Sequence, residues 1–340
     1  MSNALKFSGA PGSPYTRKML ALLRYRRIPH QLLLGDIGAR EDLPKAKVRL
    51  LPTFYLPNDS GELEAVVDST PLIRRFEGDF EGRAVIAADP VVAFVDALLE
   101  DYADEWLTKP MFHYRWAYPA DIAKSAAILP RWRNPSASDE AMAEAGRMFS
   151  TRQIERLWVV GSNETTGPVI EASYARFLDA FDTVLRNQPF LLGQLPGAAD
   201  FAVYGQLSQL AKFDPTPAAL TLERAPRVVA WCDLIDDLSG LSEEGASRLG
   251  REEIKSALGG MLTEVGRVYT PFLLANADAL QRGADRVETE IDGQPWTQKP
   301  FPYQGKCLLA LREEFGSLAT EDRIAVLQIL DGTGCEALFD

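Results

Sequence analysis

The spacing of hydrophobic residues predicts alternating strands and helices over the first eighty residues. A short apolar run at 4–9 predicts a strand, and the apolar spacing that follows Pro14 predicts a helix, because a proline fits the first turn of a helix. Residues 30–36 then predict a second strand. The three segments form a βαβ unit with an expected right-handed crossover.

A hairpin and a second helix complete this first block. Residues 53–56 and 64–67 predict two strands, because the segment 58–61 between them carries the turn residues Asn, Asp, Ser and Gly. The segment Asp68-Ser69-Thr70-Pro71 predicts a helix start, with capping side chains followed by an early proline. The order is β-α-β followed by β-β-α.

From about residue 88 the strand pattern stops and helical spacing replaces it. Asp89-Pro90 has the form of a helix start, and amphipathic helical segments continue to about residue 240. A block of strands and helices followed by a block of helices predicts two adjoining domains, at 1–82 and 88–240.

The last hundred residues, 241–340, have a third pattern. They predict a helical stretch interrupted near Gly259-Gly260, a hairpin around Asp292-Gly293, and two final helices of which the second ends at Gly332. The pattern leaves open whether this extension is a separate small module or a flap over the helical block.

Composition and charge exclude several classes of function. The net charge of -12 over 340 residues argues against a general nucleic-acid or anionic-membrane surface. The chain has no apolar run of eighteen residues and no visible secretory signal. Its three cysteines, Cys232, Cys307 and Cys335, are far apart, which fits a reducing cytosol, and its two histidines form no metal-binding pattern. We therefore expect a cytoplasmic protein without a metal ion.

The segment Ser13-Pro14-Tyr15-Thr16 places a hydroxyl group at the tip of the first predicted helix. A serine at this position can act simply as an N-cap. It can also donate a hydrogen bond to a ligand bound at the helix tip, and Tyr15 and Thr16 offer further hydroxyl groups.

Four motifs in their order along the chain resemble the glutathione transferase family. They are Ser13-Pro14-Tyr15-Thr16, Leu51-Pro52, Asp68-Ser69, and the segment 193–207 with Asp200 in a capping motif. The resemblance covers residues 1 to about 240. It implies a thioredoxin-like βαβββα domain (α/β), then an all-helical (all-α) C-terminal domain, with 241–340 as an unusual extension of helices and a hairpin. It also implies that Asp200 serves folding and not catalysis.

The resemblance implies that glutathione is the co-substrate and that Ser13 stabilises its thiolate. Lowering the pKa of a thiol by about two units needs roughly 2.7 kcal/mol. One charge-assisted hydrogen bond, worth about 1.5–3 kcal/mol, together with a helix N-terminus has the required size.

The resemblance also implies a set of glutathione-binding residues, each with a simpler alternative. Leu51 and Pro52 would present a turned backbone to the tripeptide if their peptide bond is cis, but the bond can also be an ordinary trans bond. Asp68 and Ser69 would bind the γ-glutamyl end at a helix N-terminus, or only cap that helix. Arg49 would meet the glycine carboxylate, or lie on a solvated face.

For the second substrate, the candidates are Tyr15, Tyr114 and Trp116, although aromatic residues at helical spacing more often belong to a core. His113 has no neighbouring Asp or Ser motif and is not a candidate for a catalytic triad. We therefore expect a homodimeric transferase that conjugates glutathione to a small, hydrophobic electrophile. The alternative is a non-catalytic binding or scaffold protein whose extension docks a partner. A disulfide reductase is disfavoured because no cysteine stands at the helix tip.

Overall fold

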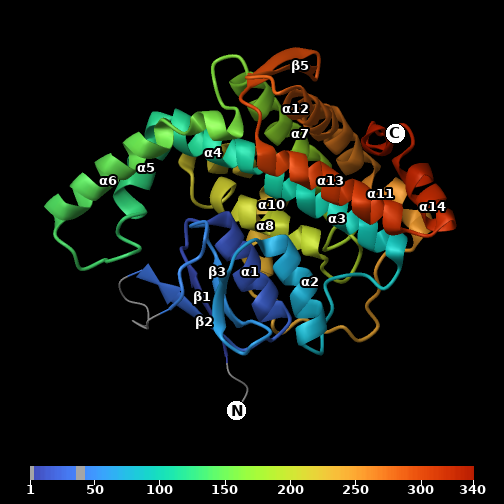
Figure 1. Ribbon diagram of the computed structural model, residues 1–340, viewed down its shortest axis with the longest axis horizontal. Helices are drawn as coiled ribbons and strands as arrows, with labels where there is room; N and C mark the ends of the chain where they lie inside the picture. The colour runs from blue at the N-terminus through green and yellow to red at the C-terminus, as the bar shows by residue number, and fades with distance from the viewer. Residues whose placement is uncertain (1–3, 36–42) are drawn as a thin grey trace.

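A four-stranded mixed sheet lies at the base of the molecule, shown in blue in Figure 1. The computed structural model describes residues 4–35 and 43–340. The strand order is β2-β1-β3-β4, with β1 parallel to β2 and antiparallel to β3, and with β3 antiparallel to β4. The strands are β1 (Leu5–Gly9), β2 (His30–Leu34), β3 (Thr53–Pro57) and β4 (Leu63–Val66).

Two helices accompany the sheet and complete a thioredoxin-like arrangement. They are α1 (Pro14–Tyr25), which connects the parallel strands, and α2 (Ser69–Asp79). Phe7 of β1 stacks on Phe54 of β3 with ring centroids 4.6 Å apart, and both side chains are completely buried. The predicted βαβββα order is confirmed.

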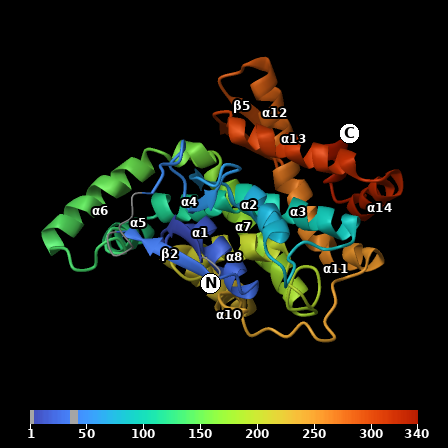
Figure 2. The same ribbon diagram turned by 60° about the horizontal axis from the view of Figure 1, so that its bottom comes forward.

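An all-helical layer follows, as expected. Its helices are α3 (Pro90–Glu105), α4 (Thr108–Ala117), α5 (Pro119–Ile128), α6 (Asp139–Ile154), α7 (Gly167–Leu185), α8 (Ala198–Leu210), α9 (Pro215–Arg224) and α10 (Pro226–Ile235). Helices α5 and α6 project to one side of the body in both ribbon views (Figures 1 and 2).

Helix α8 lies at the centre and packs on both α1 and α3. Its approach to α1 requires Gly205, because a Cβ atom there would come within 2.6 Å of the Pro14 carbonyl oxygen. The buried Asp200 carboxylate accepts hydrogen bonds from the backbone N–H groups of Gly197 and Leu191, each at 2.9 Å. Asp200 thus makes the expected capping bond at the start of α8.

The extension covers the face of the helical layer that is turned away from the sheet (Figures 1 and 2). Helices α13 and α14 pack on α3, and α11 packs on α7. The extension therefore packs directly against the helical block. Its elements are α11 (Arg251–Glu264), a π-helical turn (Val265–Tyr269), α12 (Thr270–Arg282), β5 (Val287–Ile291), β6 (Gln294–Gln298), α13 (Pro302–Ser317) and α14 (Thr320–Leu330).

The predicted break at Gly259-Gly260 is wrong, because α11 runs through both glycines. The helix departs from α geometry later, in the π-helical turn that precedes Pro271. Proline has no N–H group and cannot continue the regular hydrogen-bond ladder. In the same turn, a Cβ atom at Gly266 would lie 2.0 Å from the Thr333 carbonyl oxygen. The predicted hairpin is confirmed, with positive φ at Asp292 and Gly293.

Within the described residues, no helix has both the length and the apolar character needed to span a membrane. All three cysteines are buried and free of disulfide bonds.

Candidate functional site

A cavity of about 440 Å³ lies where the sheet domain, the helical layer and the extension meet. Its size falls within the range of small-molecule sites, about 300–1,000 Å³. The sheet domain contributes Leu51, Pro52, Asp68 and Ser69 to its wall, and the extension contributes Phe301, Tyr303 and Gln304. The predicted glutathione-binding motifs and the extension thus line one cavity.

The tip of α1 and the loop before β3 are in direct contact. Ser13 is the N-cap of α1, and its Oγ accepts a hydrogen bond from the Thr16 N–H at 3.3 Å. The same hydroxyl donates to the Leu51 carbonyl oxygen over a long 3.4 Å. The Leu51–Pro52 peptide bond is cis. Ser13 therefore acts as a cap through its oxygen lone pair, while its proton is held only weakly.

The start of α2 differs from the predicted capping arrangement. Asp68 has φ 84° and ψ 111°, and its side chain makes no capping hydrogen bond. Its carboxylate instead accepts a hydrogen bond from the Tyr303 hydroxyl of α13 at 2.7 Å. Ser69 is buried and accepts from Lys18 Nζ at 3.2 Å. The first N–H groups of α2 are thus not capped by the Asp68 side chain. Backbone N–H groups at a helix start can bind an anion.

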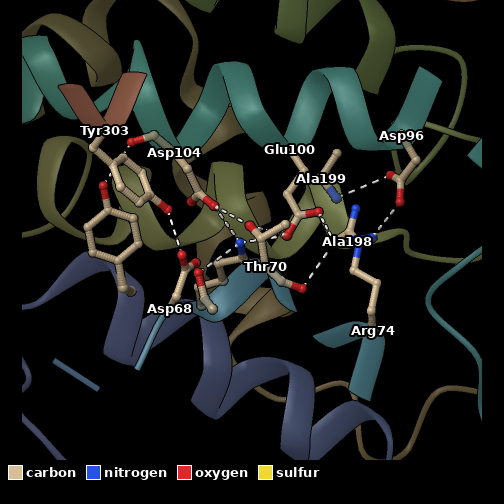
Figure 3. A network of polar contacts seen from close by, with 12 residues as sticks. Asp68, Thr70, Arg74, Asp96, Glu100, Asp104, Ala198, Ala199 and Tyr303 are labelled. Carbon is tan, nitrogen blue, oxygen red and sulfur yellow. Dashed lines mark hydrogen bonds and ion pairs between the residues drawn. The ribbon is translucent and has the colours of Figure 1, made fainter. Parts of the chain in front are cut away.

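A buried ion network lies under this helix start (Figure 3). Lys18 Nζ lies 2.7 Å from Glu100 Oε1 and 2.5 Å from Asp104 Oδ2. Burial opposes charge on Glu100, but Lys18 and Arg74 outweigh it and lower its pKa to about 2. Burial raises the pKa of Asp104 to about 6, although Lys18 opposes the rise. The network joins α1, α2 and α3 below the cavity.

A stripe of acidic residues on α3 forms one wall of the cavity. Asp101, Asp104 and Glu105 all line it, and their i, i+3, i+4 spacing places them on one helix face. Burial, assisted by the neighbouring carboxylates, raises the pKa of Glu105 to about 8. Burial also raises the pKa of Asp101 to about 7. None of the predicted site residues belongs to this wall, although the spacing of its acidic residues in an otherwise apolar helix is visible in the sequence.

The remaining wall is largely apolar. It includes Val48 and Leu50 from the loop before β3, Phe112 from α4, and Val159 and Val160 from the segment before α7. Arg156 also lines the cavity and is exposed. The cavity wall therefore has an acidic part on α3 and a largely hydrophobic part.

The three predicted substrate residues have different positions. Tyr15 lines the cavity, and its hydroxyl donates to the Asp104 carbonyl oxygen at 2.8 Å. Tyr114 and Trp116 lie in the helical core, where Tyr114 packs on Tyr174 and Trp116 packs on Phe149. The two residues do not line the cavity, because their positions on α4 face inward.

The predicted ligand of the glycine carboxylate, Arg49, is exposed and does not line the cavity.

His113 has partners that its sequence neighbours do not reveal. Its Nδ1 lies 2.7 Å from Ser162 Oγ, and its Nε2 lies 3.0 Å from Glu171 Oε1. Ser162 is buried and lies outside the cavity wall. The contacts therefore join α4 to α7 and the turn before it, and give no accessible nucleophile.

In the described part of the chain, no group of three or more His, Cys, Asp or Glu side chains has the arrangement of a metal site.

Family models match both main parts of the chain. The model described as "Glutathione S-transferase, N-terminal domain" matches residues 7–84. The model described as "Glutathione S-transferase, C-terminal domain" matches residues 139–234. Together they span about half of the chain. No curated protein matches the chain.

Several solved structures are similar at low identity. One is a Tau class glutathione S-transferase from mango, at 17% identity and TM-score 0.42, covering 69% of this chain and 89% of that one. Another is a glutathione S-transferase from Methylobacterium radiotolerans in complex with glutathione sulfonate, at 16% identity and TM-score 0.38, covering 69% and 91%. A third is a glutathione transferase family member from Pseudomonas fluorescens with bound glutathione, at 18% identity and TM-score 0.34, covering 68% and 94%.

Proposed function

The chain belongs to the glutathione transferase family, and from this premise we propose that it conjugates the thiolate of glutathione to a small, electrophilic acceptor. One observation carries the proposal. The Ser13 hydroxyl contacts Leu51, and Leu51, Pro52, Asp68 and Ser69 line a single cavity of suitable size. Because these residues come from three separate loops, their meeting at one cavity is a property of the fold.

Ser13 is proposed to stabilise the glutathione thiolate. Its hydroxyl proton is engaged only at 3.4 Å with the Leu51 carbonyl oxygen, so a sulfur anion can compete for it. The nearby N-terminus of α1 adds a favourable potential for a negative charge. In the reaction the sulfur lone pair forms a C–S bond with the acceptor, and the acceptor's leaving group departs with the electron pair of the broken bond.

The start of α2 is proposed to bind the γ-glutamyl carboxylate. Its N–H groups lack a cap from the Asp68 side chain, and Ser69 can donate its hydroxyl proton while its oxygen accepts from Lys18. The cis Leu51–Pro52 segment would pair with the cysteinyl backbone of glutathione, in the manner of an added strand. Arg49 remains a proposed ligand for the glycine carboxylate.

The hydrophobic side of the cavity is proposed to hold the acceptor. Tyr15, Phe112 and Phe301 supply aromatic surface there, and Phe301 belongs to the extension. The extension would therefore shape acceptor choice from within the same chain. We further propose that the protein is a cytoplasmic homodimer, which light scattering on the purified protein would test.

The central experiment compares two serines that are both helix N-caps. Ser13→Ala is expected to reduce conjugation of a generic electrophile at least tenfold, about the effect of one lost charge-assisted hydrogen bond. Ser138→Ala is the matched control. Ser138 caps α6 in the same way, because its Oγ accepts a hydrogen bond from the Ala141 N–H at 3.3 Å, and it lies on the projecting arm away from the cavity. Equal activities of the two variants would remove the role given to Ser13.

The competing function is a non-catalytic binding or scaffold protein. One contact favours it, because the Tyr303 hydroxyl already occupies the carboxylate of Asp68, a residue predicted to bind the γ-glutamyl end of glutathione. Calorimetry with glutathione separates the two readings: measurable binding favours the transferase, and absence of binding favours the scaffold.

A further inference from the structure

We propose that the second ligand of the cavity carries a cationic nitrogen, an ammonium or guanidinium group on an apolar body, which binds to the acidic wall of α3 and to Gln304. Naming this ligand as the acceptor of the conjugation rests on the proposed function. Its binding to the cavity can be measured without glutathione.

The first observation is the unequal distribution of charge around the cavity. Four carboxyl side chains line it, and Arg156 is the one basic residue among the described residues of its wall. The carboxylates nearest to the predicted glutathione motifs already have donors, because Asp68 accepts from Tyr303 and Asp104 accepts from Lys18. The cavity therefore favours a positively charged group over a second anion.

The second observation is a pair of unsatisfied acceptors at the same wall. Gln304 is 2% exposed and donates through Nε2 to the Glu105 carbonyl oxygen at 3.3 Å, which leaves its buried Oε1 without a partner. Asp104 is 6% exposed, and its Oδ1 also lacks a partner. Buried acceptors are normally hydrogen-bonded. A ligand with several N–H donors satisfies them, whereas a carbonyl or carboxylate ligand does not.

The third observation is that Glu105 makes no ion pair within the described residues, although the charge of Lys109 acts on it and opposes the rise of its pKa. The neighbouring Lys109 donates to the Val160 carbonyl oxygen at 3.2 Å and lies 4.0 Å from the centroid of the Phe272 ring. Asp101 accepts from the Tyr269 hydroxyl, a neutral donor, at 2.6 Å. A ligand cation would supply the missing charge.

The carboxyl groups of this wall titrate near neutral pH. The pKa values of Asp104, Asp101 and Glu105 are raised to about 6, 7 and 8, in each case mainly by burial. A bound cation favours the ionised carboxylates, so its binding releases protons. The titratable and charged groups that face this wall from the elements packed against it are Tyr15, Lys18, Asp68, Lys109, Arg156, Tyr269, Tyr303 and Cys307.

The ligand is expected to be an organic cation. The acidic residues of the described chain do not form a metal-binding arrangement, and the rest of the cavity wall carries apolar side chains such as Leu50, Phe112 and Phe301. A cation with an aromatic or aliphatic body uses both sides of the cavity.

The test is a calorimetric titration with two ligands of equal shape, 2-phenylethylammonium and the neutral 2-phenylethanol. We expect the ammonium ion to bind at least tenfold more tightly at pH 7. Titrations in two buffers of different ionisation enthalpy should detect release of about one proton for the ammonium ion and none for the alcohol. Equal binding of the two ligands overturns the proposal.

Two variants locate the binding. Glu105→Gln is expected to weaken binding of the ammonium ion about tenfold and to leave binding of the alcohol unchanged. Glu313→Gln makes the same substitution on the exposed face of α13 and should change neither affinity. An unchanged ammonium affinity in Glu105→Gln would place the cation elsewhere and overturn the proposal.

A third titration separates this proposal from the proposed function. The ammonium ion should bind equally well in the presence of saturating glutathione, and competition between them would overturn a separate subsite. A protein that binds the ammonium ion but not glutathione supports the cation site and removes the transferase. A protein that binds glutathione but does not prefer the ammonium ion removes only the cation site.

Discussion

Lys18 and Lys109 are both completely buried, but their surroundings are opposite. Lys18 lies among carboxylates, with Nζ within 2.7 Å of both Glu100 and Asp104. Burial alone would lower its pKa, but Asp104 and Glu100 outweigh burial and raise it. Lys109 lies among aromatic rings, with Nζ within 6 Å of the ring centroids of Trp106, Phe272 and Trp296. Burial lowers the pKa of Lys109 to about 7.

The difference shows how the two sides of the cavity are held together. The sheet domain is fixed to α3 by the buried ion pairs of Lys18 with Glu100 and Asp104. Removing the lysine leaves the two carboxylates buried without the cation they share. The extension is fixed to α3 and α4 mainly by apolar packing around Trp296, and the Lys109 charge opposes its own burial there. Mutation of the sheet-domain contact should therefore cause a large loss of unfolding free energy, whereas the contribution of the extension contact should vary with pH.

The largest effect is expected for Lys18→Met. The substitution leaves Glu100 and Asp104 buried without their shared cation and should lower the free energy of unfolding by about 3–5 kcal/mol. Urea unfolding at pH 7 measures the loss. The control is Lys212→Met, which breaks a surface ion pair with Asp233 and should cost about 1 kcal/mol or less. A similar small loss for Lys18→Met would contradict the comparison.

A smaller effect is expected for Lys109→Met, about 1 kcal/mol or less at pH 6. The ordinary pKa of lysine, 10.5, exceeds the value of about 7 in the folded protein, so the unfolded chain binds more protons between these values. The stability of the wild type should therefore rise from pH 7 to pH 10 relative to the variant. Urea unfolding at pH 6, 8 and 10 measures this trend. A difference in unfolding free energy between wild type and variant that does not vary with pH would show that Lys109 stays charged in the folded protein.

Glu105→Gln tests the acidic wall between these two regions. The carboxyl group keeps its proton to a pKa of about 8 in the folded protein, compared with 4.5 ordinarily, so the wild type loses stability as pH rises from 4.5 to 8. Glutamine does not titrate. The variant should therefore gain melting temperature relative to the wild type between pH 5 and pH 8, by at least about 2 °C. A difference in melting temperature between the two proteins that stays constant across this pH range would rule out the raised pKa of Glu105.

The smallest effect is expected for Tyr303→Phe, which removes the direct hydrogen bond from the extension to Asp68. Tyr303 is 41% exposed, so water can replace its hydroxyl, and the loss of unfolding free energy should stay below about 1 kcal/mol. Urea unfolding measures it. A loss above about 2 kcal/mol would show that the extension depends on this polar contact and not mainly on packing.

Much of the fold could be predicted because hydrophobic periodicity and the residues that begin helices or form turns are local signals. The strands of the first block, the helices that begin at Pro14 and Pro90, and the hairpin at Asp292-Gly293 follow from them. The π-helical turn before Pro271 could not be located, because two glycines earlier in the same helix are the more obvious interruption. Those glycines face open space, where an α-helix tolerates them.

The site was only partly visible in the sequence. The family motifs identified Ser13, Leu51 and Ser69 as candidates, and the fold brings them to one cavity or its edge. The motifs gave no indication of Glu105, because acidic residues on a helix are usually solvated. Tyr114 and Trp116 show the reverse case, since aromatic residues in a helix can equally well face a cavity or a core.

The sequence by itself determined the order of the elements, the family and the residues at the helix tips, because these depend on short-range spacing and on motifs. Only the tertiary structure decided that the extension lines the cavity, that Asp68 contacts Tyr303 instead of capping α2, and that Glu105 and Lys109 are buried. The physical reason is that burial and charge compensation depend on which distant segments pack together. In this chain, segments about 200 residues apart set the electrostatics of a single cavity.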